Sequence, residues 1–154
     1  MSRLQQEIKQ TRPFSSLAEE TFLNLQRTAD RLLAGEAEVL ARHDLTPPQY
    51  NVLRILRGAG AEGHPCQEIA ARMISRVPDI TRLVDRLEQA GLANRARDRA
   101  DRRVVTVRIA ARGEHLLASI DPVMRELPKR LFGALTTRDL QTLNELLVRA
   151  RADR

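Results

Sequence analysis

The stretch from Gln67 to Ile109 constrains the fold of this 154-residue chain more than any other. It reads QEIAARMISRVPDITRLVDRLEQAGLANRARDRADRRVVTVRI. Two helical patterns separated by a short turn come first, and two strand-like runs on either side of an arginine-rich tip follow them. This order predicts a helix-turn-helix with a β-wing. A basic second helix beside a basic hairpin is suited to duplex DNA, because each element can enter a different groove.

The second helix of this stretch presents one apolar face and one polar face. Apolar residues recur at helical spacing from Ile80 to Leu87, Pro78 fits the first turn, and Gly91 supplies the left-handed residue that closes the helix. The side chains that we expect to contact DNA lie at its start and along its polar face: Arg76, Pro78, Asp79, Thr81, Arg82 and Arg86. Arginine binds guanine or phosphate, aspartate accepts from cytosine, and threonine contacts thymine. Arg82 and Arg86 form an unfavourable like-charged pair, which a bound anion explains better than a solvated helix face does.

The two strand-like runs are expected to form a wing. Residues 93–97 read as a short extended segment, residues 98–103 as the turn, and residues 105–109 alternate as a half-buried strand. Five arginines crowd this region and are expected to contact DNA: Arg95, Arg97, Arg99, Arg102 and Arg103. Only Asp98 and Asp101 offset their charge. A narrow minor groove concentrates negative potential and attracts such a tip. The alternative is an exposed loop of biased composition.

Helical patterns flank this region on both sides. Residues 1–14 are expected to form a short helix or an arm, and a long helix begins at Ser15 or Ser16 and runs to about Arg42. The run Leu45–Gln49 starts the next helix, with a threonine N-cap, a proline at the first position and a glutamine that completes a capping box.

The helical period returns after the wing. Pro122 and Pro128 should kink the first helix of this C-terminal part, and Thr136 or Thr137 should cap a last amphipathic helix. The predicted element order is therefore four helices, two strands and two helices.

The predicted fold class is mainly α with a small β-wing. A winged helix-turn-helix lobe over residues 45–111 is flanked by dimerisation helices at 15–42 and 112–154. The terminal helices carry more apolar surface than one thin lobe can cover. We therefore expect them to pack against a second copy in a two-fold homodimer.

The composition limits the classes of partner. Lysine and arginine number 26 against 20 acids, which gives a net charge of +6 and favours polyanions. Aromatic residues are only 3% and tryptophan is absent, which argues against the stacking platforms of single-strand binders. The sequence shows no leader-like start and no apolar run near the roughly 18 residues of a membrane helix. We expect a cytoplasmic location and no membrane partner.

No motif in the sequence indicates catalysis, a cofactor or a metal site. Residues 58–63 match GxGxxG, but dinucleotide binding needs a strand before this loop, whereas a helix precedes it here. The three histidines have no second ligand at metal spacing. The single cysteine, Cys66, excludes an intrachain disulfide; it is either a redox switch or a small packing residue, and we expect the second.

Three runs occur together in one order and spacing: LTPPQYNVL over Leu45–Leu53, DITRLVDRLE followed by GL over Asp79–Leu92, and the wing triplet Asp101-Arg102-Arg103. From about residue 17 to residue 149 the chain resembles the MarR (multiple antibiotic resistance regulator) family of winged-helix transcription factors. The triplet matches the Asp-x-Arg pattern of the family's wing. The run Ile109–Gly113 departs from the family, because it lacks the threonine before the glycine that opens the next helix. That helix start should be capped differently.

The resemblance implies a homodimer in which the first, fifth and sixth helices intertwine. It implies that each recognition helix enters a major groove and each wing tip a flanking minor groove. By that match Arg103 is the minor-groove residue, and Asp101 stabilises the wing through an ion pair with a nearby arginine. The family also implies a small-molecule effector, often an aromatic acid, between the dimer helices and the reading lobe. Residues of the first helix, Tyr50 and the start of the fifth helix are candidates for that pocket.

The sequence therefore predicts a sequence-specific transcriptional regulator that binds double-stranded DNA. We expect a ligand-responsive repressor that acts as a homodimer on a pseudo-palindromic operator, with half-sites about 10 bp apart. The main alternative is a sequence-indifferent architectural protein, which would bind random duplexes equally well. An enzyme or carrier on this fold lacks a catalytic constellation, and a winged helix used for protein contacts would not need so many arginines in its wing.

Overall fold

A computed structural model of the chain describes residues 1–97 and 105–152. Its elements follow in this order: α1 (Arg3–Glu7), α2 (Leu17–Ala41), α3 (Pro47–Ala59), β1 (His64–Pro65), α4 (Cys66–Arg72), α5 (Ile80–Gln89), β2 (Ala93–Arg97), β3 (Val105–Ile109), α6 (Ala111–Leu131) and α7 (Thr137–Arg151). The mainly helical fold with one small sheet confirms the predicted class. None of the helices in these two ranges combines the length and the apolarity that crossing a membrane requires.

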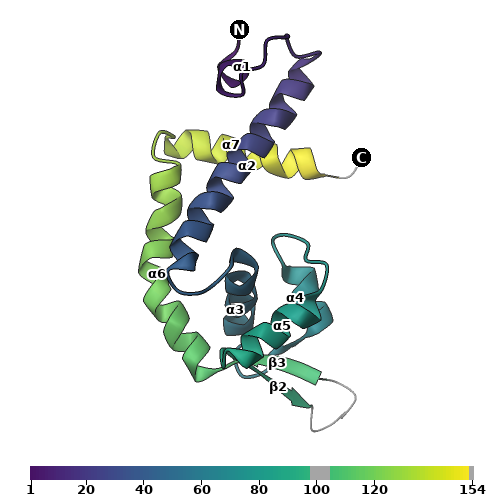
Figure 1. Cartoon of the computed structure of the whole chain (residues 1–154), viewed down its shortest axis with the longest axis vertical. Helices are drawn as coiled ribbons and strands as arrows, with labels where there is room; N and C mark the ends of the chain where they lie inside the picture. The colour runs from purple at the N-terminus through teal and green to yellow at the C-terminus, as the bar shows by residue number, and fades with distance from the viewer. Residues whose placement is uncertain (98–104, 153–154) are drawn as a thin grey trace.

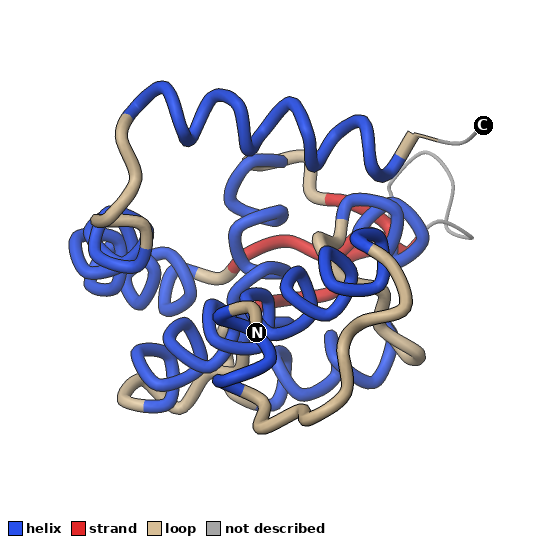
Figure 2. The backbone as a smooth tube through the Cα atoms, turned by 90° about the horizontal axis from the view of Figure 1, so that it is seen from above, coloured by secondary structure: helices blue, strands red, loops and turns tan. Residues whose placement is uncertain are grey.

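The elements form a lobe at one end of the molecule and a set of long helices at the other (Figure 1). The lobe contains α3, α4, α5 and the strands. α2 extends from the lobe toward the N-terminus, and α6 packs beside α2. α7 then runs along one side of the molecule toward the C-terminus (Figure 2).

Side-chain caps start α2, α3 and α7, as the sequence predicts. The Ser16 hydroxyl accepts a hydrogen bond at 3.1 Å from a backbone N–H in the first turn of α2. Thr46 and Gln49 form the expected capping box at α3, and Thr136 forms another with Asp139 at α7. Each cap satisfies backbone N–H groups that the first helical turn leaves without partners.

A three-stranded antiparallel sheet and an apolar core hold the lobe together. β3 lies between β1 and β2, so that Val107 pairs with His64 on one side and with Arg95 on the other. The largest fully buried side chains come from α2, the helices of the lobe, β3 and the first half of α6: Leu40, Val52, Leu53, Leu56, Ile69, Val84, Leu87, Val107, Leu117 and Ile120. The core therefore joins the lobe to two of the long helices. Cys66 packs against this core as a partly buried residue.

Two short elements add to the expected order. β1 is missing from the prediction because its two residues, one of them a proline, are too few to show a strand period. α1 decides between the helix and the arm expected over residues 1–14. Residues 60–63 form the loop between α3 and β1, as expected for a GxGxxG match without a preceding strand. α6 continues as one helix through Pro122 and Pro128.

The start of the recognition helix, α5, differs in detail from the prediction. Pro78 was expected in the first turn of α5 but lies before its N-cap residue, Asp79, because the aspartate carboxylate caps the helix one residue later. On α4, Ile69 is fully buried and Ala70 is exposed. Gly91 closes α5 with the expected positive φ of 69°.

Gly113, in the first turn of α6, lies directly against the strand region. A Cβ at this position would be 2.4 Å from the Leu92 carbonyl oxygen and 2.8 Å from Ile109 Cγ1. The preceding N-cap residue, Ala110, makes no side-chain capping bond, which confirms that this helix start is capped differently. The absence of a side chain at Gly113 thus permits the close packing of α6 on the lobe.

We predict that Gly113→Ala lowers the free energy of unfolding by about 1–3 kcal/mol, because the backbone must move to admit the methyl group. Gly58→Ala is the matched control: a Cβ there meets no atom within 4 Å, so alanine should leave stability unchanged or raise it by up to about 1 kcal/mol. Urea unfolding measures both changes. Equal stability of Gly113→Ala and the wild type would contradict the close approach.

Candidate nucleic-acid interface

The turn between α4 and α5 is anchored to α3. Asn51 Oδ1 accepts a hydrogen bond from the Ile74 N–H at 2.9 Å. Asp79 caps α5 through its carboxylate, which accepts from the Arg82 N–H at 2.9 Å. These bonds fix where α5 begins relative to α3, and therefore where its N-terminal side chains lie.

The residues of the helix-turn-helix that the sequence predicts as DNA contacts are all exposed: Arg76, Pro78, Asp79, Thr81, Arg82 and Arg86. The first two precede α5, the third caps it, the next two lie in its first turn and the last lies in its final turn. Arg82 and Arg86 border a shallow groove of about 360 Å³ together with Thr46 and Pro48 from the start of α3. The fold thus gathers cations and a hydroxyl on one open face.

The two strands of the wing form over the predicted ranges, and the predicted tip, residues 98–103, lies outside the described residues. β2 and β3 pair in antiparallel fashion from Ala93–Ile109 to Arg97–Val105. Arg97 ends β2. Four of the residues named for the wing lie outside the described residues: Arg99, Asp101, Arg102 and Arg103.

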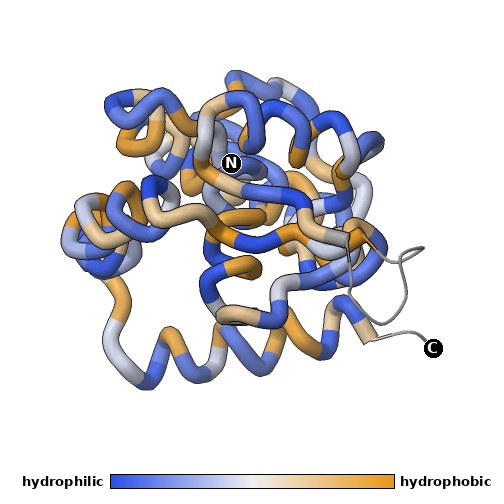
Figure 3. Tube along the Cα trace, turned by 90° about the horizontal axis from the view of Figure 1, so that it is seen from below, coloured by the Kyte–Doolittle hydropathy of each residue, from blue (hydrophilic) through white to orange (hydrophobic). Residues whose placement is uncertain are grey.

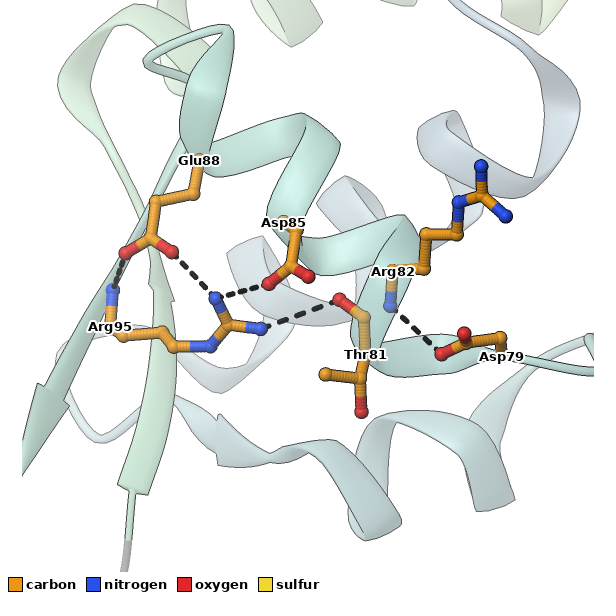
Figure 4. A network of polar contacts seen from close by, with 6 residues as sticks. All are labelled: Asp79, Thr81, Arg82, Asp85, Glu88 and Arg95. Atoms are coloured by element: carbon orange, nitrogen blue, oxygen red, sulfur yellow. Dashed lines mark hydrogen bonds and ion pairs between the residues drawn. The ribbon is translucent and has the colours of Figure 1, made fainter.

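Arg95, which the sequence prediction grouped with the tip arginines, lies in the middle of β2 and contacts α5 (Figure 4). Its guanidinium Nη1 lies 2.6 Å from Asp85 Oδ1 and 2.6 Å from Glu88 Oε2. Its Nη2 donates to the Thr81 carbonyl oxygen at 3.3 Å, and its backbone N–H donates to Glu88 Oε1 at 3.0 Å. Arg95 therefore joins the wing to the recognition helix.

The charges around α5 are divided between two sides of the helix. Burial acts to lower the pKa of the Arg95 guanidinium, but the hydrogen bonds to Asp85 and Glu88 and the negative charges of these carboxylates together outweigh burial and raise this pKa. The Arg82 guanidinium points away from this cluster (Figure 4). One side of α5 thus holds a cation between two carboxylates, while another presents a cation to solvent.

A second ion pair joins the lobe to α6. Arg57, near the end of α3, donates from Nη1 to Asp121 Oδ2 at 2.8 Å and from Nη2 to Asp121 Oδ1 at 3.0 Å. These hydrogen bonds lower the pKa of the Asp121 carboxyl and raise the pKa of the Arg57 guanidinium. Because both terminal nitrogens of the guanidinium donate to the same carboxylate, the pair fixes the relative orientation of the two side chains.

Two cavities lie where the lobe meets the long helices. The first, of about 260 Å³, is lined by Tyr50, Arg54, Arg57, Asp121, Met124 and Arg125. The second, of about 450 Å³, lies between α2, the start of α3 and residues 73–75. Two carboxylates, Asp30 and Glu36, line the second cavity, and none of the described residues around it is cationic. Burial raises the pKa of the Glu36 carboxyl and of the Tyr50 hydroxyl.

The residues that the sequence suggested for an effector pocket are divided between these cavities. Tyr50 lines the first cavity together with residues from the middle of α6. The first long helix, α2, lines the second cavity instead.

Sequence reasoning did not find the residues that position the reading surface. Asp85 and Glu88 are three residues apart and so share a helix face, which could have indicated a common cation. No local pattern identifies that cation as Arg95, because the pairing of the strands brings it there. Arg57 and Asp121 are 64 residues apart, so the sequence carries no signal of their contact.

The geometry defines a winged helix-turn-helix DNA-binding protein: an exposed polar recognition helix, α5, held beside an antiparallel wing. Comparison with known proteins agrees with this class. Residues 45–105 match the model of the MarR family. The chain is 33% identical over 126 residues to the HTH-type transcriptional repressor IacR of Pseudomonas putida. The aligned residues make up 82% of this chain and 74% of that protein.

Solved structures give the same result. A MarR transcription factor from Planctomyces limnophilus is 40% identical, with a TM-score of 0.68 over 88% of this chain and 98% of that one. CouR from Rhodococcus jostii RHA1, solved bound to p-coumaroyl-CoA, is 25% identical, with a TM-score of 0.74 over 87% of this chain and 93% of that one. The chain belongs to the MarR family of DNA-binding transcriptional regulators.

Proposed function

We propose that this chain is a ligand-responsive repressor that binds a pseudo-palindromic operator as a homodimer. The observation that carries the proposal is the exposed polar face of α5, with Thr81 and Arg82 in its first turn and the wing held beside it. Similarity to IacR, whose name describes a transcriptional repressor, supports the direction of regulation.

Two kinds of contact would bind the operator. Cationic side chains on phosphates supply most of the affinity and its salt dependence, whereas side chains that reach base edges supply sequence preference. Thr81 and Arg82 are proposed to read bases, because the N-terminal residues of a recognition helix contact base edges in the major groove. By the family match, Arg103 is proposed as the minor-groove contact and Asp101 as the residue that stabilises the wing.

We predict that Arg82→Ala and Arg103→Ala weaken DNA binding in different ways. Loss of Arg82 should cost about 1–3 kcal/mol of discrimination at one base position and affect random duplexes less. Loss of Arg103 should weaken operator binding with little change in fold stability. Binding isotherms on a duplex enriched by in vitro selection and on a random duplex measure both effects, with Arg130→Ala on α6 as the control. An equal loss on both duplexes would make Arg82 a phosphate contact, and unchanged affinity would remove Arg103 from the interface.

The same isotherms separate this proposal from the sequence-indifferent alternative. An architectural protein would bind the selected and random duplexes with similar affinity, and both affinities would fall steeply with salt. A specific regulator binds its selected duplex more tightly at the same salt concentration.

The apolar faces of α2 and α7 support the proposed homodimer. α7 is a capped helix of 15 residues that has no buried residue in the single chain, although apolar residues recur along it (Figure 3). Leu146 on α7 is 50% exposed, and Phe22 on α2 is 59% exposed. Amphipathic helices pack their apolar faces against a partner, and a second copy supplies both faces by two-fold symmetry.

We predict that the wild-type chain sediments at twice its 17.4 kDa mass at micromolar concentration. Leu146→Glu should weaken the dimer by about tenfold or more, because a charge would enter the apolar interface. Gln141→Glu adds a charge at an exposed polar position of the same helix and should leave the dimer intact. A monomeric wild-type chain would contradict the dimer.

The cavity lined by Tyr50 and Met124 is proposed as the effector site. Asp121 already pairs with Arg57 in this cavity, so Arg54 and Arg125 carry the remaining positive charge, which suits a carboxylate. Tyr50 and Met124 suit an aromatic ring. The larger cavity carries two carboxylates and fits an acid less well. CouR, similar in fold and 25% identical, was solved with p-coumaroyl-CoA, which supports an aromatic acid derivative as the class of ligand.

We predict that hydroxybenzoates or hydroxycinnamates raise the melting temperature of the wild-type chain and weaken its binding to the selected duplex. In the proposed homodimer, a ligand can prefer an arrangement of the two DNA-binding lobes that does not fit the operator. Such a ligand lowers the affinity for DNA by the ratio of its own affinities for the two arrangements. Arg125→Ala should abolish the thermal shift, whereas Arg130→Ala, also on α6, should preserve it. Equal shifts in the two variants would place the ligand elsewhere.

A further inference from the structure

We infer that Arg95 is a positioning residue for DNA binding: it holds the wing at a fixed place on the recognition helix and does not itself contact DNA. The inference rests on the proposed reading of DNA by α5 and the wing. It separates Arg95 from the other wing arginines, with which its position in the sequence alone would group it.

The contacts of Arg95 follow one face of α5. Its guanidinium reaches the Thr81 carbonyl oxygen, the Asp85 carboxylate and the Glu88 carboxylate, at positions i, i+4 and i+7 of the helix (Figure 4). One rigid, planar group therefore contacts residues from about two turns of the recognition helix. The backbone N–H of Arg95 also donates a hydrogen bond to Glu88, so the backbone of β2 is held to α5 as well as the Arg95 side chain.

The local charge argues against a phosphate contact at this position. Asp85 and Glu88 bring two negative charges to one guanidinium, and the Arg95 side chain is only 25% exposed. A phosphate would have to displace a carboxylate that already lies 2.6 Å from Nη1 and would meet a second one beside it. Arg82, by contrast, points away from the cluster on an exposed side of the helix.

We call the cluster of Arg95 with Asp85 and Glu88 the brace. Its position explains what it contributes. β2 begins next to the core, where Leu92 and Ala93 are buried, and leads from there to the wing tip. Arg95 ties β2 to α5 two residues further along, beyond the part that apolar packing holds. Its bond to the Thr81 carbonyl reaches the first turn of α5, which also presents the Thr81 and Arg82 side chains. The brace therefore links the two elements that must enter neighbouring grooves together.

A mutant cycle tests the assignment on the full-length chain. The variants are Arg95→Ala, the nearly isosteric pair Asp85→Asn with Glu88→Gln, and all three changes combined. Two controls change the charge outside this cluster. Arg108→Ala, at an exposed position of β3, removes one positive charge, and Glu114→Gln, in the first turn of α6, removes one negative charge. The probe is the duplex selected by the wild-type chain, and affinity is measured over a series of salt concentrations. Thermal unfolding verifies that every variant is folded.

The brace predicts a loss of affinity of at least about tenfold for Arg95→Ala, because a displaced wing loses several contacts at once. The slope of log affinity against log salt should fall by more than the roughly 0.9 of a single phosphate. The Asp85→Asn and Glu88→Gln pair should also weaken binding, although removing negative charge near DNA by itself strengthens it. The combined variant should bind no more weakly than Arg95→Ala, since all three residues act as one unit.

Each other outcome overturns the assignment in a recognisable way. If Arg95 contacts a phosphate, its loss lowers the slope by about 0.9, and the carboxylate variant binds DNA more tightly. If the cluster only stabilises the fold, the slope is unchanged and affinity follows the melting temperature. A wild-type chain that selects no duplex would overturn the proposed function together with this assignment, whereas unaltered binding by the variants would overturn the assignment alone.

Hydrogen exchange without DNA gives a readout that does not depend on the operator. Amides of β2 and β3 should exchange faster in Arg95→Ala and in the carboxylate variant, while those of α3 keep their protection. Unchanged exchange in the strands would show that the contacts do not hold the wing in place.

Discussion

The apolar junction between Leu40 at the end of α2, Leu53 in α3, and Leu117 and Ile120 in α6 is the interaction on which the rest of the molecule depends. All four side chains are fully buried in one core. Burying an aliphatic side chain of this size contributes roughly 1.5–3 kcal/mol, so this junction supplies much of the driving force that holds lobe and long helices together. Because only 3% of the residues are aromatic, aliphatic side chains must supply this apolar contact between the lobe and the long helices.

Two polar contacts fix the relative orientation of the elements that this apolar core joins. The Arg57–Asp121 pair orients the lobe on α6, and the Arg95 contacts with Asp85 and Glu88 orient the wing on α5. Partly exposed ion pairs contribute little to stability, and their value here is geometric. Both use the planar fork of arginine, which fixes an angle as well as a distance.

The sequence predicted the elements much better than it predicted the contacts between them. Helix starts at Ser16, Thr46 and Thr136 depend on side chains within the first turn, so a local pattern is sufficient to find them. The apolar stripe of α5 and the alternating pattern of β3 follow from periodicity. Asn51, by contrast, holds the turn before α5 from 23 residues away, and no periodic signal marks it.

The same limit applies to the interface residues. The arginines at the start of α5 were placed on an exposed face because helical spacing decides faces. Arg95 was grouped with its sequence neighbours, since charge composition describes a segment and not the partner of one side chain. Arg95 is distinguished only in the folded chain, where β2 pairs with β3 and the Arg95 side chain contacts Asp85 on α5.

The unburied helix α7 has a consequence for the regulator's behaviour in the cell. In the proposed homodimer α7 would acquire its hydrophobic contacts from a second copy, so the stability of the chain would increase with its own concentration by mass action. At low copy number a larger fraction of chains would have this helix frayed and open to proteases. Synthesis rate and turnover would then be linked, and scarce regulator would be cleared faster than plentiful regulator.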